Sequence, residues 1–108
     1  MSTDSTHSKA LGILREFAKS RRAILSPKAL LEYQTDFGRD ADVTHVWDAV
    51  CAATEANIHK LEPDEQNDLN TVIVLRVPLL GRAGYIKATM NIERDHNVYV
   101  QSCKLRRR

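Results

Sequence analysis

The sequence predicts a single α+β domain, residues 1–108, in which N-terminal helices pack on a C-terminal antiparallel β-sheet. Apolar residues follow a helical spacing as far as about residue 61, and after residue 70 they alternate with a period of two. The connections between the predicted strands are short, which favours an antiparallel meander. Helices that precede strands in this way are expected to cover one face of the sheet. The chain is long enough to bury one core, and it shows no internal repeat and no domain linker.

The first predicted helix starts near Ala10. Its apolar side chains recur at helical spacing, with charged residues on the opposite side. These apolar positions are Ala10, Leu11, Ile13, Leu14, Phe17 and Ala18. Residues 1–8 are rich in Ser and Thr and are expected to be flexible. The segment 21–26 breaks the helical period and is expected to run extended.

The second predicted helix has clear end signals. Ser26 is a favourable N-cap, Pro27 suits the first helical position, and Gly38 suits a C-terminal cap. Its apolar side is expected to consist of Leu30, Leu31 and Tyr33.

A third helix is expected after Asp42, which can cap it. Its predicted buried stripe is Val43, Val46, Trp47, Val50 and Thr54. As an alternative, Thr54 caps a fresh short helix that runs through Leu61. A polar loop, residues 62–68, follows.

Three strands are predicted in the last third of the chain, around residues 71–77, 85–92 and 98–105. In the middle strand Tyr85 and Lys87 face one way, and the apolar residues between and after them face the other. The side chains expected to lie against the helices are Ile86, Ala88, Met90, Val98 and Val100.

The net charge of +2 conceals an uneven distribution. Residues 1–70 contain 8 Lys and Arg against 12 Asp and Glu, whereas residues 71–108 contain 8 against 2. One interpretation is a basic face that binds a polyanion. The alternative is that the acidic half folds over the basic half and balances its charge.

Several classes of protein are disfavoured by composition. No apolar run approaches the roughly 20 residues of a membrane span, and the N-terminus lacks a secretory signal, so we expect a cytoplasmic protein without membrane contact. Cys51 and Cys103 are far apart and are expected to be reduced, buried thiols. His7 and His45 have no neighbouring second ligand, so we expect neither a metal nor another cofactor.

Five short sequence segments, in their order along the chain, resemble the motility quorum-sensing regulator (MqsR) toxin family. Members of this family are bacterial messenger-RNA endonucleases with a RelE-like fold. The five segments are "STHSKALGILREF", "SPKALLEYQTDFG", "IHK", "GYIKATM" and "NVYVQSCK", and they extend from about Thr6 to Lys104. The resemblance implies a metal-independent endoribonuclease that cleaves messenger RNA, inhibits translation and acts in a bacterial stress response. It also implies a type II toxin–antitoxin pair in which a cognate antitoxin neutralises the toxin. Family members favour GC-containing sites.

The resemblance also implies site residues. The family's two active lysines and its active tyrosine correspond to Lys60, Lys104 and Tyr85. The family uses a Gln on the first strand of the meander, whereas Val72 stands nearest to that place here. The residues expected to hold the RNA backbone are Arg76, Arg82, Lys87, Arg106, Arg107 and Arg108.

The chemistry can also be argued from the residues. Metal-independent RNA cleavage needs a base for the ribose 2′-hydroxyl, an acid for the 5′-oxygen and cations beside the phosphate. Tyr85 and Lys87 share one sheet face because they are two residues apart, and Lys104 comes from the neighbouring strand, where we expect it to lie beside them. His59, beside Lys60, can serve as acid or base, although a lone helical His is more often a surface residue. A non-enzymatic nucleic-acid-binding or regulatory domain on the same scaffold is the alternative, and the missing Gln favours it.

Overall fold

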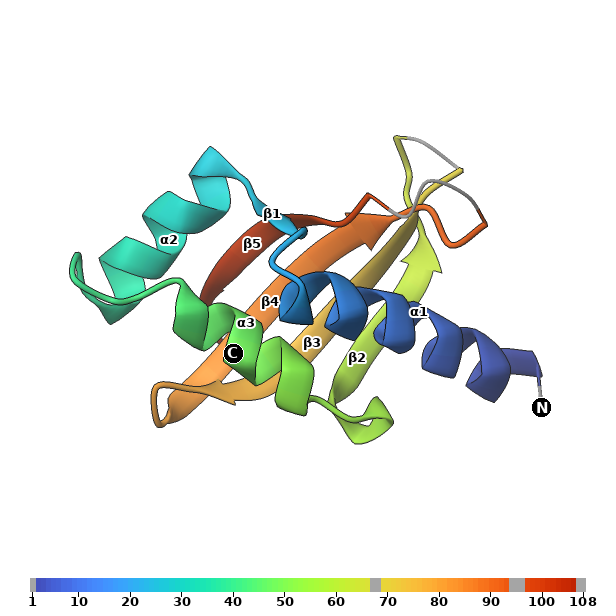
Figure 1. The fold of residues 1–108 in the computed structure, drawn as a ribbon, viewed down its shortest axis with the longest axis horizontal. Helices are drawn as coiled ribbons and strands as arrows, with labels where there is room; N and C mark the ends of the chain where they lie inside the picture. Colours follow the sequence, from blue (N-terminus) through green and yellow to red (C-terminus); the bar gives the residue numbers. More distant parts are fainter. Residues whose placement is uncertain (1, 67–68, 94–96, 107–108) are drawn as a thin grey trace.

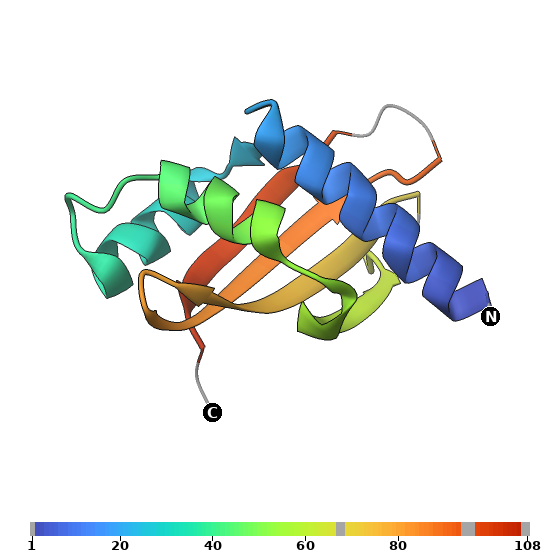
Figure 2. The same ribbon diagram turned by 60° about the horizontal axis from the view of Figure 1, so that its bottom comes forward.

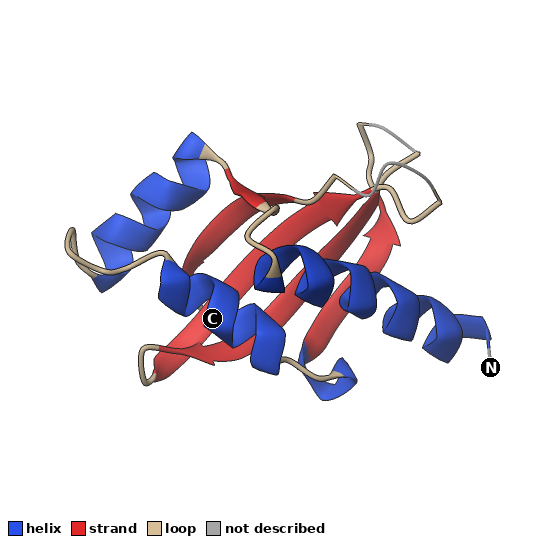
Figure 3. Ribbon diagram, in the orientation of Figure 1, coloured by secondary structure: helices blue, strands red, loops and turns tan. Residues whose placement is uncertain are grey.

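The computed structural model describes residues 2–66, 69–93 and 97–106, with side chains from residue 6 onward (Figures 1 and 3). The helices are α1 (Ser2–Lys19), α2 (Pro27–Phe37), α3 (Thr44–Ala52) and a short 3₁₀ helix, η1 (Glu55–Asn57). The strands are β1 (Ile24–Leu25), β2 (Ile58–Pro63), β3 (Thr71–Leu79), β4 (Arg82–Met90) and β5 (Tyr99–Leu105). The predicted α+β class is confirmed.

The strands form one five-stranded sheet in the order β1-β5-β4-β3-β2. Strands β2 to β5 pair antiparallel, and β1 pairs parallel with the first residues of β5. The predicted meander therefore forms the centre of the sheet. β1 lies in the segment that was expected to run extended, while β2 was not predicted as a strand.

One face of the sheet is covered by α1 and α3, as Figure 2 shows. The side chains of β3 and β4 beneath these helices alternate along each strand, as the pleat requires. All five residues that were predicted to face the helices are buried: Ile86, Ala88, Met90, Val98 and Val100. The register predicted for the meander is thus confirmed.

α2 lies beside β5 and has the predicted ends. The Oγ atom of Ser26 accepts a hydrogen bond from the Ala29 amide at 3.0 Å, and Gly38 has a φ of 112°. Its buried residues are Ala29 and Tyr33. The prediction for Leu31 is wrong, because this side chain is 65% exposed and lies away from the core.

The chain after α3 departs further from expectation. Thr54 is exposed and lies beyond the end of α3, so it does not belong to the buried stripe. It caps η1 instead, through a reciprocal capping box with Asn57. The new helix is only three residues long, and the chain then enters β2 rather than continuing as a helix to Leu61.

The N-terminal helix starts at Ser2, well before the apolar pattern begins at Ala10. Cys51 is half-buried and Cys103 is buried, and both are unpaired. Within the described ranges, no helix has the length and apolar character needed to cross a membrane.

Candidate active site on the open face of the sheet

We call the side of the sheet opposite α1 and α3 the open face. Strand register assigns its side chains, because residues next to a core residue in a strand point to the opposite side. On the two central strands these are Val72, Val74 and Arg76 of β3 and Tyr85, Lys87 and Thr89 of β4. β3 and β4 carry no Asp or Glu anywhere along their length. The centre of the open face is therefore positively charged.

A β-bulge places Lys104 on this face. Lys87 pairs with Ser102 and its neighbour Ala88 pairs with Val100, so Gln101 is one residue too many on β5. Strict alternation from the buried Val100 would direct Lys104 toward the helices. The surplus residue reverses that alternation and places Lys104 directly opposite Tyr85.

A second bulge acts in the same way on Lys60. Ile58 pairs with Leu75 and Lys60 pairs with Val74, its neighbour, so His59 is the surplus residue on β2. Ile58 therefore packs toward the core, while Lys60 lies on the open face. Both lysines that were predicted to be catalytic reach the same face as Tyr85 because of a one-residue bulge.

The candidate residues fall into two neighbouring rows across the sheet. In the first row Arg76 pairs with Tyr85, and Tyr85 pairs with Lys104. In the second row Lys60 and Lys87 both pair with Val74, from opposite sides. Rows two residues apart are separated by roughly 6.8 Å along a strand. This spacing brings the phenol, the guanidinium and three ammonium groups onto one surface.

His59 stands at the end of the first row. Its Nε2 atom lies 3.1 Å from Nη2 of Arg76. His59 is exposed, but desolvation by its neighbours lowers the pKa of this imidazole, and the nearby cations of Arg76, Lys60 and Arg106 lower it further. His59 is a surface residue, as expected, but it lies on a strand rather than on a helix and contacts a predicted site residue.

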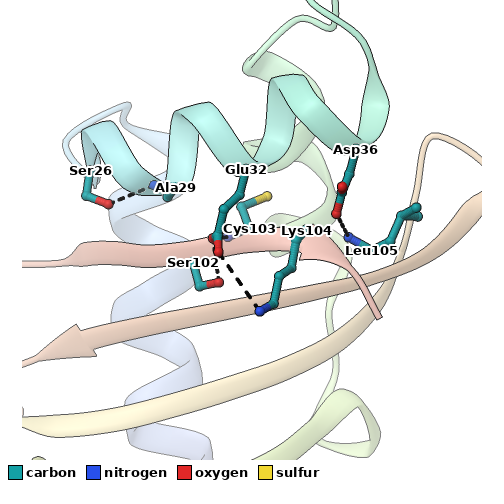
Figure 4. A network of polar contacts seen from close by, with 8 residues as sticks. All are labelled: Ser26, Ala29, Glu32, Asp36, Ser102, Cys103, Lys104 and Leu105. Atoms are coloured by element: carbon teal, nitrogen blue, oxygen red, sulfur yellow. Dashed lines mark hydrogen bonds and ion pairs between the residues drawn. The ribbon is translucent and has the colours of Figure 1, made fainter. Parts of the chain in front are cut away.

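Lys104 is held between two partners (Figure 4). Its Nζ atom lies 5.4 Å from the centre of the Tyr85 ring and 3.9 Å from Oε2 of Glu32 on α2. The Lys104 side chain is 33% exposed, so this ammonium group remains accessible to a ligand. The prediction that Lys104 lies beside Tyr85 is confirmed.

Two carboxylates of α2 fasten the outer edge of β5 (Figure 4). Oε1 of Glu32 accepts hydrogen bonds from Ser102 Oγ at 2.6 Å and from the Cys103 amide at 3.3 Å. Oδ2 of Asp36 accepts from the Leu105 amide at 2.9 Å. The spacing fits, because four residues of a helix rise about 6 Å and two residues of a strand rise about 6.8 Å. Glu32 therefore fixes the segment that carries Lys104.

A hollow of about 320 Å³ lies at the β3–β4 turn, on the side of the first row away from the second row. Its lining includes Arg76, Arg82 and Arg106, and the Arg106 amide donates to the Ala83 carbonyl at 2.9 Å. The Arg82 guanidinium donates to the Asp36 carbonyl at 3.1 Å and lies over the Phe37 ring. Arg82 is thus oriented toward α2, whereas Arg76 belongs to the row with Tyr85. Arg107 and Arg108 lie outside the described residues.

Val72, the position where the resemblance implies a Gln, is only 6% exposed and lies on the open face. It lines a second hollow, of about 240 Å³, together with Lys87, Gln66 and Gln101 and with the acidic residues Glu62, Asp64 and Glu65. An amide therefore reaches this region from the bulge of β5 rather than from β3. Gln101 was not among the predicted site residues, because no sequence signal shows that a bulge turns it toward Val72.

Among the described residues, no group of three or more His, Cys, Asp or Glu side chains is arranged to hold a metal ion. Comparison of the chain with protein-family models, with curated proteins and with solved structures found no match.

Proposed function

We propose that this protein is a metal-independent endoribonuclease that cleaves messenger RNA, on a RelE-like arrangement of helices and sheet. The observation that carries the proposal is the pair of bulges, which turn Lys60 and Lys104 onto the face of Tyr85 and Arg76. Bulges are enriched beside active sites, where they redirect side chains. Four cations and a phenol, with no carboxylate on the two central strands, suit a phosphodiester whose charge grows during reaction.

In the proposed reaction the ribose 2′-oxygen attacks the adjacent phosphorus and displaces the 5′-oxygen. Arg76 and Lys87 stabilise the charge that develops on the phosphate. Lys104, held by Glu32 and Tyr85, protonates the leaving 5′-oxygen. Lys60 and Arg106 hold the flanking backbone.

By the same resemblance, we propose that the protein acts in the cytoplasm as the toxin of a type II toxin–antitoxin pair in a bacterial stress response. Its partners would then be messenger RNA and a cognate antitoxin protein. Expression without the antitoxin should arrest growth and shorten messenger RNA.

The direct test is cleavage of a labelled messenger RNA by purified protein in buffer containing EDTA. Wild type should give fragments that end in a 2′,3′-cyclic phosphate and a 5′-hydroxyl. Lys104→Ala should be slowed, while Lys9→Ala should not, because Lys9 carries the same charge on the exposed surface of α1. Activity that is lost in EDTA and restored by a divalent metal would overturn the metal-independent mechanism.

A second candidate function is a non-enzymatic nucleic-acid-binding or regulatory domain. The apolar Val72 favours it, since this side chain cannot donate or accept a hydrogen bond at the place where the resemblance implies an amide. Well-folded protein that binds RNA in EDTA and leaves it intact would support this second function.

A further inference from the structure

The first row of the open face is rich in hydrogen-bond donors and poor in acceptors. Ammonium and guanidinium groups at neutral pH have no lone pair, so Arg76 and Lys104 cannot take a proton. His59 is the nitrogen base in this row, and the bulge of β2 places it there.

The surroundings of His59 favour its neutral form. Three cations face it from three parts of the chain: Lys60 on its own strand, Arg76 on β3, and Arg106 after β5. Desolvation and these charges hold the pKa of the imidazole below its ordinary value. In the free protein the contact with Arg76 Nη2, at 3.1 Å, occupies the Nε2 lone pair.

His59 can accept a proton at Nε2 only after Arg76 has moved away, and the bound substrate can draw Arg76 away. A phosphodiester anion forms stronger, bidentate hydrogen bonds with a guanidinium than a neutral imidazole does. The Arg76 backbone is also anchored, because its carbonyl accepts from Asn57 Nδ2 at 2.9 Å. Only the side chain of Arg76 therefore has to turn toward a phosphate bound over Tyr85.

We propose that His59 is the general base of the cleavage reaction, and that Arg76 releases its Nε2 atom when the scissile phosphate binds. This inference rests on the proposed ribonuclease function. Nε2 takes the proton of the ribose 2′-hydroxyl as the 2′-oxygen bonds to phosphorus. The bond between phosphorus and the 5′-oxygen breaks, and the 5′-oxygen takes a proton from the Lys104 ammonium. The products are a 2′,3′-cyclic phosphate and a 5′-hydroxyl, so no water and no oxidant is consumed.

The distance between the two ends of the row suits this division of roles. An in-line displacement needs the base and the acid on opposite sides of phosphorus. Neighbouring strands are about 4.8 Å apart, so three strand intervals separate the backbones of β2 and β5 by roughly 14 Å. Side chains that extend inward from both ends leave room for one phosphodiester group above Arg76 and Tyr85.

The first experiment is a pH profile of single-turnover cleavage by wild type, His59→Gln and His45→Gln. His45 is an exposed His on α3 and serves as the matched control. The cleavage rate of wild type should rise with pH and reach a plateau, and the midpoint of this rise should report the pKa of the imidazole. The rate of His59→Gln should no longer rise with pH in this way, and at neutral pH it should be lower than that of wild type by about 100-fold or more. His45→Gln should match wild type. If the rate of His59→Gln still rises with pH in this way and stays within about threefold of wild type, the assignment is wrong.

Two further measurements separate chemistry from folding. Added imidazole should restore cleavage to His59→Ala, since a role in folding alone would not respond to a free base. An NMR titration should show the His59 pKa rising when a 2′-deoxy oligonucleotide binds and draws Arg76 away. No such rise would overturn the release by Arg76. If wild type itself leaves RNA intact at every pH, the proposed function fails; if wild type cleaves and His59→Gln cleaves equally, this inference alone fails.

Discussion

Deleting Gln101 should be well tolerated, although Gln101 lies within a strand beside the candidate site. Its neighbours Val100 and Ser102 already pair with the consecutive residues Ala88 and Lys87. Removing the surplus residue therefore leaves a regular ladder in which Val100 still faces the core and Lys104 still faces Tyr85. We expect the deletion to cost less than about 2 kcal/mol, the scale of one or two backbone hydrogen bonds.

Deletion of Val100, one position earlier, is the matched control. Val100 is 0% exposed, and its loss removes about 1.5–3 kcal/mol of apolar burial. If Gln101 takes the vacated place, its unpaired amide costs about 1–3 kcal/mol more. The sum, about 2.5–6 kcal/mol, is a large part of the 5–15 kcal/mol that stabilises an ordinary domain.

Urea denaturation monitored by fluorescence of the buried Trp47 measures both deletions. Wild-type cleavage by the Gln101 deletion would confirm that Lys104 keeps its place. A Gln101 deletion that unfolds, or that loses as much free energy as the Val100 deletion, would refute the argument that Gln101 is surplus to the ladder.

Three other changes have distinct expected outcomes. Removing residues 106–108 should weaken RNA binding and lower its salt dependence by up to about one phosphate contact per Arg, whereas Lys104→Ala should slow single-turnover cleavage more than it weakens binding. The assignment is reversed if the truncation abolishes chemistry at saturating protein and Lys104→Ala does not. Gly84→Ala should destabilise the fold by about 1–3 kcal/mol in urea titrations, because its Cβ would lie 2.9 Å from the Val77 carbonyl oxygen; unchanged stability would contradict this. Burial raises the pKa of the Cys103 thiol to about 12. Alkylation at pH 8 should therefore modify the half-buried Cys51 first. Equal labelling of the two cysteines in folded protein would show that β5 opens.

The sequence predicted α2 and the centre of the sheet well, because their signals are local. Ser26, Pro27 and Gly38 mark the ends of α2, and the alternation in residues 85–92 marks β4. Each of these signals depends on a few neighbouring residues and on no distant contact.

The bulges explain why β2 was not predicted and why the position of Lys104 could not be derived from alternation. The surplus His59 places two core residues, Ile58 and Leu61, three positions apart, which imitates the spacing of a helix. At Gln101 the same effect separates Val100 from Cys103 by three positions. Alternation from Val98 would have turned Lys104 toward the helices, so its place beside Tyr85 was expected only from its position on the neighbouring strand and from the resemblance.

The carboxylates of α2 also have a consequence for how this sheet can grow. An edge strand with free amide groups is a template on which another chain can add a strand. Along β5 that template is occupied, because β1 pairs with Tyr99 and Val100 while Glu32 and Asp36 accept from the amides of Cys103 and Leu105. The edge strand on that side, β1, is only two residues long, whereas β2 has six, so we expect a peptide that extends this sheet to dock along β2. There it would cover Lys60 and His59, so a peptide that adds a strand to the sheet would at the same time inhibit the proposed site.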